Sequence, residues 1–239
     1  TIIGNGTFSR NELTNIQFPD SLVTIGAAAF FGNQLTSLSI PNGVTTIGNS
    51  AFENNQLKSI EVPDSVTAIG NYAFSENQLT YVVIPNGVTT IGSWTFAQNQ
   101  LTSVIIPESM ITIGDYAFSF NQLIEVIILN GLESIGEGAF SGNRLISLQL
   151  PNSIRTIGND AFVANQLSSL QLSDNLTTIG NSAFSWNQLN SIVIPESVVS
   201  IGDSAFSHNI IEEIVILGEK TRFNNLWEQI GFPVELKSD

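Results

Sequence analysis

The sequence predicts a β-rich solenoid of ten stacked coils, each 22 residues long. Three residue types recur at this spacing without exception: glycine from Gly4 to Gly202, phenylalanine from Phe8 to Phe206, and asparagine from Asn11 to Asn209. No insertion or deletion interrupts the three series. A fixed period of this length indicates that each unit stacks on its neighbours and buries its apolar side chains against them.

The first half of each coil is expected to form a short strand. Residues 37–40 alternate between polar and apolar with the period of two that is typical of a strand, and Leu38 faces the core. Pro41 ends the strand because proline lacks the N–H that a sheet requires. We expect ten such strands, from Leu13–Phe18 to Ile211–Ile216, to pair in parallel register about 4.8 Å apart.

The second half of each coil is expected to contain a turn, a second strand and a helical turn. Asn42–Gly43 is a typical turn sequence, and Val44–Ile47 is rich in the β-branched residues that favour strands. Gly48 is expected to recur because the next bend needs a positive φ. Residues 49–54 are predicted to form one helical turn that places Phe52 in the core.

The invariant series are interpreted as structural. The phenylalanines are expected to form a spine through the core. A buried asparagine needs hydrogen-bond partners, and an identical series can bond its amides to the loop backbone of the neighbouring coil. Each coil is expected to bury about seven apolar side chains, which in the second coil are Leu35, Leu38, Ile40, Val44, Ile47, Ala51 and Phe52.

The composition excludes several classes of function. The 239 residues carry 21 Asp and Glu against 7 Lys and Arg, a formal net charge of −14, which disfavours nucleic acid and anionic membrane surfaces as partners. The sequence has no cysteine, no zinc-ligand spacing and no glycine-rich phosphate loop, so we expect no metal and no cofactor. No stretch approaches the roughly 20 apolar residues that span a bilayer, so we expect no membrane insertion.

The repeat motif resembles a known family. The pattern Leu-x-x-Ile-x-Leu-Pro-x-x-Leu-x-x-Ile-Gly-x-x-Ala-Phe-x-x-Cys/Asn is met by Leu101, Val104, Ile106, Pro107, Met110, Ile113, Gly114, Ala117, Phe118 and Asn121. With this motif repeated over residues 1 to about 217, the chain resembles the BspA-like, or Treponema-type, leucine-rich repeat proteins. The resemblance implies a right-handed superhelix with a parallel concave sheet, short second strands and single helical turns.

The same resemblance also implies a location and a general role. Proteins of this class are found on bacterial surfaces or are secreted, and adhesion to host proteins or other cells is the role associated with them. We therefore expect an extracellular or cell-surface protein. No catalytic residues accompany the resemblance, so none are assigned.

Two regions are expected along the chain. Residues 1–217 form the solenoid, which begins within a repeat because Thr1–Gly4 matches the middle of the next coils. Residues 218–239 lack the period and are expected to cap the last coil with a short helix over 221–230. The apolar side chains that would cover the open core are Phe223, Leu226, Trp227 and Ile230.

One candidate site lies on the predicted concave sheet. Function is sought at outward positions that vary between coils, because the invariant positions build the fold. The middle coils present Tyr81, Val83, Ile105 and Ile127 as one contiguous apolar patch. Such a patch marks a protein-binding surface, although β-branched residues also favour strands when no partner binds. Separately, the repeat pattern departs from its usual proline at Leu129, Ser173 and Leu217.

A second candidate site lies two residues before the core phenylalanines. Tyr72, Trp94 and Tyr116 occupy this position in three consecutive coils and are expected to form an exposed aromatic ladder. Phe120 follows Tyr116 by four residues and would share its face of a helical turn. Such a row suits a protein partner or a sugar ring, and the other interpretation is a packing ladder without a ligand.

We expect a non-catalytic scaffold that recognises a protein partner, such as a host or cell-surface protein. A carbohydrate-binding module that uses the aromatic ladder is the first alternative, and a structural spacer within a larger surface protein is the second. Enzymatic activity is not expected, because the one histidine, His208, has no distinctive catalytic arrangement near it in the sequence.

Overall fold

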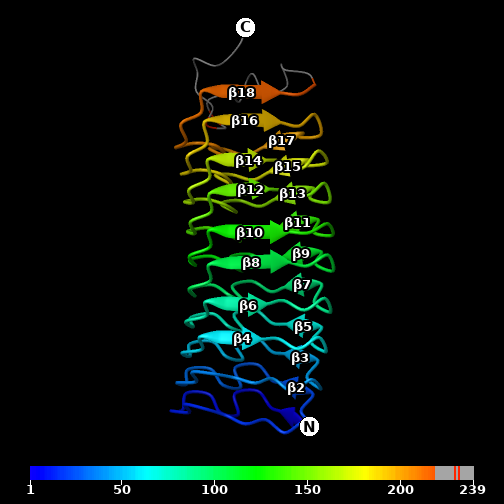
Figure 1. The fold of residues 1–239 in the computed structure, drawn as a ribbon, viewed down its shortest axis with the longest axis vertical. Helices are drawn as coiled ribbons and strands as arrows, with labels where there is room; N and C mark the ends of the chain where they lie inside the picture. The colour runs from blue at the N-terminus through cyan, green and yellow to red at the C-terminus, as the bar shows by residue number, and fades with distance from the viewer. Residues whose placement is uncertain (219–228, 230, 232–239) are drawn as a thin grey trace.

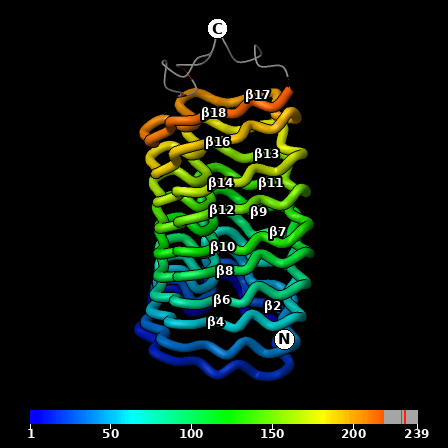
Figure 2. Tube along the Cα trace, turned by 45° about the horizontal axis from the view of Figure 1, so that its top comes forward, coloured from blue at the N-terminus to red at the C-terminus, as the bar shows by residue number. Residues whose placement is uncertain are grey.

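The computed structural model describes residues 1–218, 229 and 231, whose coils stack along one axis to form a column (Figure 1). Within these residues the regular structure consists of eighteen short strands, and no helix is present. Successive coils follow one another without a break, so each coil adds one rung to the same faces of the column (Figure 2). The predicted parallel β-solenoid with a 22-residue period is confirmed.

One face of the column is a continuous parallel sheet of ten two-residue strands, which we call the short-strand face. Each strand pairs with its counterpart in the next coil, as Ile25 pairs with Ile47, and each ends in an isoleucine that faces the core. The strands are β1 (Ile2–Ile3), β2 (Thr24–Ile25), β3 (Thr46–Ile47), β5 (Ala68–Ile69), β7 (Thr90–Ile91), β9 (Thr112–Ile113), β11 (Ser134–Ile135), β13 (Thr156–Ile157), β15 (Thr178–Ile179) and β17 (Ser200–Ile201).

A second face carries longer strands, and we call it the long-strand face. Its eight strands form four separate two-stranded parallel sheets, β4–β6, β8–β10, β12–β14 and β16–β18. The strands are β4 (Ser59–Glu61), β6 (Tyr81–Val83), β8 (Ser103–Ile106), β10 (Glu125–Ile128), β12 (Ser147–Gln149), β14 (Ser169–Gln171), β16 (Ser191–Ile194) and β18 (Glu213–Ile216).

The single ten-stranded concave sheet predicted for this face is therefore not formed. Residues 13–18 and 35–40, which the structure describes in full, contain no strand, and the remaining strands pair only two by two. The coils of β4 and β6 are joined next to these strands, where Thr80 donates its N–H to the Lys58 carbonyl at 3.0 Å. Within the described residues β6 and β8, by contrast, are not paired. The other faces keep the coils in register, so two long strands can separate locally without a register shift.

The predicted helical turn at residues 49–54 is not confirmed, because this segment forms tight turns with alternating backbone handedness. Ser50 and Asn54 each have a φ of 55°, in the left-handed region. The N–H groups of Ser50, Phe52 and Asn54 donate to carbonyls of the next coil at 2.8, 2.8 and 3.0 Å. In a helix they would bond within the segment, so the turns provide a further ladder of hydrogen bonds between coils.

The glycine series recurs for a different reason from the one predicted. All ten of these glycines are described by the structure, and none has a positive φ. A Cβ built on Gly114 would lie 2.8 Å from backbone atoms of Gly92 and Ser93 in the preceding coil. Glycine is required because the two coils approach each other too closely for any side chain.

The phenylalanine series forms the predicted spine. Its rings stack from Phe8 to Phe206, with centroids 5.3–5.6 Å apart. The surrounding apolar side chains form one continuous core from Phe18 to Ile216. Burial of a large apolar side chain contributes about 1.5–3 kcal/mol, and most of this burial is against neighbouring coils. Stacking of coils therefore stabilises the fold far more than contacts within one coil do.

The asparagine series holds adjacent coils together, as predicted. Asn99 accepts the N–H of Leu79 at its Oδ1, with a distance of 2.9 Å. Its Nδ2 donates to the carbonyls of Phe74 and Phe96 at 3.0 and 3.2 Å. Leu79 and Phe74 lie in the preceding coil, so one buried amide satisfies backbone groups of two coils.

The predicted helix over 221–230 and its covering side chains lie outside the described residues, apart from position 229. Gln229 lies against the last coil, where its carbonyl accepts the N–H of Ser204 and its Nε2 donates to Asp203 Oδ1 at 2.6 Å. In the preceding coil the equivalent residue, Ser182, donates its N–H to the Asp203 carbonyl of the next coil. Gln229 thus occupies part of the position of a further coil, and the cap and its boundary at 217/218 stay predictions.

Replacement of Gly114 by alanine is expected to lower the free energy of unfolding by about 1–3 kcal/mol, because the new Cβ would overlap backbone of the preceding coil. Gly114→Asn should destabilise at least as much, whereas a glycine required for positive φ would tolerate asparagine better than alanine. Urea unfolding followed by circular dichroism measures both. The exposed turn variant Asn86→Ala serves as the control and should change the free energy by less than about 0.5 kcal/mol. An asparagine variant as stable as the native protein would contradict this account of the glycine.

Candidate functional site

The predicted apolar patch is exposed on the long-strand face. Strands β6, β8 and β10 direct Tyr81, Val83, Ile105 and Ile127 outward, with exposed fractions of 56, 42, 56 and 42%. The alternate residues of these strands point into the core and are at most 7% exposed, which fixes the direction of the outward ones. Ile105 and Ile127 pair in register. The structure therefore places the four predicted residues on three consecutive coils of one face.

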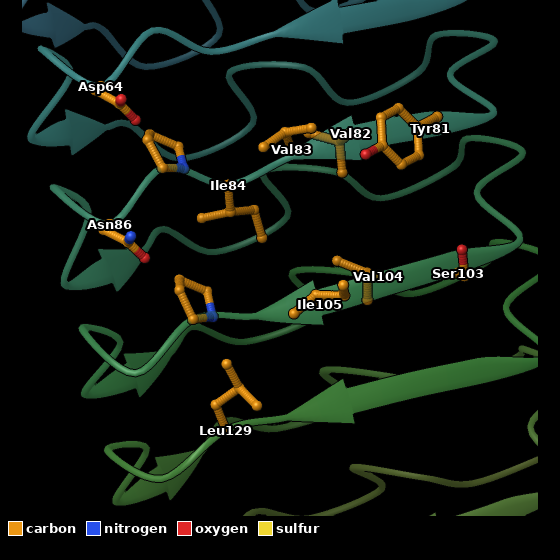
Figure 3. A pocket seen from close by; sticks show the side chains of 12 residues that line it. Asp64, Tyr81, Val82, Val83, Ile84, Asn86, Ser103, Val104, Ile105 and Leu129 are labelled. Carbon is orange, nitrogen blue, oxygen red and sulfur yellow. The ribbon is translucent and has the colours of Figure 1, made fainter.

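An open groove of about 350 Å³ lies beside this patch, at the interruption between β6 and β8 (Figure 3). Tyr81, Val83 and Ile105 line it, while Asp64 and Leu129 contribute from the coils on either side. Because β6 and β8 are not paired, their separation leaves room for the groove. The groove thus lies at one of the places where this face differs from the predicted continuous sheet.

A second open groove, of about 510 Å³, follows along the column between β10 and β12, which are also unpaired. Ile127, Glu108 and Glu125 are among its lining residues. Leu129 lines both grooves and is 39% exposed. Leu129 is not among the residues predicted for the site, and the only sequence signal for it is that it replaces the proline of the repeat.

The aromatic ladder forms as predicted from its spacing. The Tyr72 and Trp94 rings stack at 6.0 Å between centroids, and the Trp94 and Tyr116 rings at 4.5 Å. The three rings belong to consecutive coils, so Trp94 has one ring on each side of its indole. Tyr72 is exposed, whereas Trp94 and Tyr116 are half-buried. Much of the ring surface is consequently used in contacts within the ladder.

The ladder positions have an uncommon backbone conformation. Tyr72, Trp94 and Tyr116 have φ values of 59°, 61° and 55°, in the left-handed region that costs a residue with a side chain about 1–2 kcal/mol. The equivalent residue of every coil has a positive φ, whether it is a glycine, as at Gly6 and Gly138, or carries a side chain. Aromatic stacking contributes about 0.5–1.5 kcal/mol per pair, so ring contacts offset part of the backbone strain.

Tyr116 also makes a polar contact at the end of the ladder. Its hydroxyl donates to Glu137 Oε1 at 2.7 Å. This hydrogen bond, together with burial and the negative charge of Glu137, raises the pKa of Tyr116 to about 12. Burial, followed by repulsion from Glu137, raises the pKa of the Asp160 carboxyl. The ladder therefore continues into an acidic region and not into another aromatic ring.

Phe120 occupies a position separate from the ladder. It is 55% exposed and has a φ of 54°, so the residues around it do not form the helical turn on which the predicted shared face with Tyr116 was based. A Cβ built on Gly142 would lie 2.9 Å from the Phe120 ring, and Tyr116 approaches Gly138 in the same manner. The Tyr116 and Phe120 rings thus lie over two different glycines of the next coil.

The remaining candidate chemistry is sparse. His208 stacks on exposed Trp186 with ring centroids 4.0 Å apart, and its Nδ1 lies 3.3 Å from Ser207 Oγ. In the part of the chain that the structure describes, no group of three or more His, Cys, Asp or Glu side chains could hold a metal ion. Within the same residues, no helix is long and apolar enough to cross a membrane.

Comparison with known proteins identifies the class of repeat. The family model described as BspA type leucine rich repeat region (6 copies) matches residues 1–125 and 111–227. The chain is similar to a leucine-rich repeat protein from Bacteroides ovatus ATCC 8483, with 25% identity, a TM-score of 0.62, and 89% of this chain and 69% of that one covered.

Two further solved structures share the fold. One is a leucine rich cell surface protein from Faecalibacterium prausnitzii A2-165, with 23% identity, a TM-score of 0.53, and 98% of this chain and 86% of that one covered. The other is the pneumococcal vaccine antigen PcpA, with 21% identity, a TM-score of 0.59, and 90% and 67% covered. Comparison with curated proteins found no match.

The variant Glu137→Gln is expected to lower the pKa of Tyr116 from about 12 toward its ordinary value of 10.0, because it removes the carboxylate that accepts the hydroxyl proton. The sequence has three tyrosines, so ultraviolet titration in a Tyr72→Phe/Tyr81→Phe background reports on Tyr116 alone. Glu133→Gln, on the short-strand side of the same coil, removes an equal charge and should leave the titration nearly unchanged. The same titration midpoint in the Glu137 variant would show that this contact does not set the pKa.

Proposed function

Because the chain belongs to the BspA-type leucine-rich repeat family, we propose that it is a non-catalytic scaffold that binds a protein partner through its long-strand face. The proposed partner is a host or cell-surface protein, which makes the chain adhesin-like. The proposed location is the bacterial cell surface or the exterior of the cell, in keeping with the resemblance of its repeat motif. Stacked repeats suit this role because they present one extended, rigid surface.

The observation that carries the proposal is the contiguous apolar surface across β6, β8 and β10. Ile105 is 56% exposed, and its neighbours Val83 and Ile127 are each 42% exposed. Removal of apolar area from water contributes about 25 cal/mol per Å², so a partner that covered these residues would gain affinity. The two grooves beside them can accept side chains of the partner, as the central anchors of protein interfaces usually require.

The residues that line the groove between β6 and β8 are better suited to binding than to catalysis. Its polar side chains are few and include one carboxylate, Asp64, together with Asn86 and Ser103. A nucleophile needs a base within hydrogen-bond reach, and the lining residues include no histidine, lysine or cysteine. The groove is also open, so it does not exclude water from a bound reactant.

Replacement of Val83, Ile105 and Ile127 by serine, glutamine and serine is expected to weaken partner binding at least about tenfold, because it removes the apolar contact area. Binding can be measured on an array of purified extracellular and cell-surface proteins probed with the labelled chain. The three side chains are exposed, so the thermal unfolding midpoint should stay within about 5 °C of the native value.

The matched control replaces Val23, Ile111 and Val199 by serine, glutamine and serine. These residues are also exposed, at 43, 48 and 74%, but lie next to the short strands on another face of the column. The control should retain binding. Equal binding by native protein and by the Val83 triple variant would contradict the site. The absence of any partner on the array would favour the structural spacer.

Carbohydrate binding through the aromatic ladder remains the alternative function. The observation in its favour is the row of Tyr72, Trp94 and Tyr116 on three consecutive coils. Their mutual stacking leaves the outer face of Tyr72 as the most open ring surface, since the equivalent residue of the preceding coil is Ser50. The ladder itself is accounted for by packing between coils, which makes this the second proposal.

A glycan array tests this alternative directly. If the ladder binds sugar, native protein should give a glycan signal that Trp94→Ala reduces at least about tenfold, because loss of the central indole removes two stacking contacts of about 0.5–1.5 kcal/mol each and leaves Tyr72 and Tyr116 without the ring that holds them in one row. Trp186→Ala, which removes an exposed indole elsewhere on the column, is the control. A native protein without glycan signal would eliminate carbohydrate binding at the ladder.

A further inference from the structure

We infer that the long-strand face takes a cationic apolar polypeptide segment, in which large apolar side chains are accompanied by lysine or arginine. This inference rests on the proposed function, since it specifies the chemistry of the partner that this face would bind. It comes from the distribution of charge around the two grooves, which the apolar patch alone does not reveal.

The only charged residues at the outward positions of the long strands are negatively charged. From β4 to β18 the outward residues are Ser59, Glu61, Tyr81, Val83, Ser103, Ile105, Glu125, Ile127, Ser147, Gln149, Ser169, Gln171, Ser191, Val193, Glu213 and Val215. All sixteen are exposed, three are glutamates, and none is a lysine or arginine. A partner that approaches this face therefore meets carboxylates beside the apolar side chains.

The turns along one edge of the long-strand face add acidic residues interspersed with asparagines, which we call the acidic row. In nine of the ten coils one exposed turn position is aspartate, glutamate or asparagine: Asp20, Asn42, Asp64, Asn86, Glu108, Asn130, Asn152, Asp174 and Glu196. Five of the nine are acidic, and the last coil has Gly218 there. The row lies along one edge of the long-strand face, because the same position recurs in every coil. Basic residues are found elsewhere: Lys58 precedes β4 at the opposite end of that strand, and Arg155 lies beside the short strands.

Acidic and apolar residues meet in the grooves themselves. Asp64 lines the first groove together with Tyr81 and Ile105. Glu108 and Glu125 line the second groove together with Ile127. Among the residues that the structure describes, none of these three carboxylates has a salt bridge within the chain. A lysine or arginine of the partner would supply the missing opposite charge at the same place where its apolar side chains enter the grooves.

The dimensions suit a short extended segment. Paired strands lie about 4.8 Å apart, and β6 and β8 are not paired, so the patch from β6 to β10 extends at least about 10 Å along the column. Three residues of an extended chain, at about 3.3 Å each, cover the same length. Two or three apolar side chains of such a segment would cover the apolar patch, and an adjacent basic residue would reach the carboxylates beside it.

Three labelled synthetic peptides of equal length test this inference by fluorescence anisotropy. The first alternates leucine with lysine, the second replaces its lysines by glutamate, and the third replaces its leucines by serine. We expect the leucine–lysine peptide to bind more tightly than either of the others. Its affinity should fall as salt rises, because exposed charge pairs are screened.

The variant Glu61→Gln/Asp64→Asn/Glu125→Gln should weaken binding of the leucine–lysine peptide about tenfold, from the loss of three partly exposed charge contacts. The control Glu12→Gln/Glu76→Gln/Glu133→Gln changes the net charge by the same amount at exposed positions off the long-strand face. It should weaken binding less than about twofold. Circular dichroism of both variants verifies that each is folded.

Three outcomes would overturn the inference: equal weakening by the two triple variants, equal or tighter binding of the leucine–glutamate peptide, or no binding of the leucine–lysine peptide. The proposed function is judged separately, by the array experiment with the Val83, Ile105 and Ile127 replacements. If the leucine–glutamate peptide bound and those replacements released it, the face would still be a protein-binding site, and only the charge of its partner would differ.

Discussion

The structure depends on hydrogen bonding between each coil and the next on several faces at once. The short strands pair in every coil, the left-handed turns donate N–H groups to the following coil, and each buried asparagine bonds to the preceding one. These ladders hold only if every coil has the same length, because one extra residue would shift all contacts beyond it. The uninterrupted 22-residue period of the sequence is the consequence of this constraint.

The same constraint determines where function can lie. Inward positions such as Phe96 and Asn99 contact two coils and cannot vary without loss of packing or hydrogen bonds. Outward positions on the long strands contact no other coil through an essential bond, so they can carry apolar residues and carboxylates in combinations unique to this chain. The patch around Ile105, the two grooves and the acidic row together make this face the strongest candidate for recognition.

Much of the fold could be predicted from local pattern. The period revealed the coils, the alternation of Leu38 and Ile40 revealed which side of each strand is buried, and the asparagine and phenylalanine series were correctly assigned to structure. The members of the apolar patch and of the aromatic ladder followed from spacing alone. Predictions failed where the answer depended on contact between coils: Gly48 recurs for close approach and not for φ, and residues 49–54 bond to the next coil in place of forming a helix.

The sequence by itself determined the solenoid, its register and which side chains face outward, because each of these follows from a repeated local pattern of apolar and polar residues. Only the tertiary structure decided that β6 and β8 separate, that Leu129 joins two grooves, and that Asp64, Glu108 and Glu125 lie beside the apolar patch. Those features depend on how neighbouring coils that carry different side chains pack against one another. A repeat that specifies every coil alike contains no information about that difference.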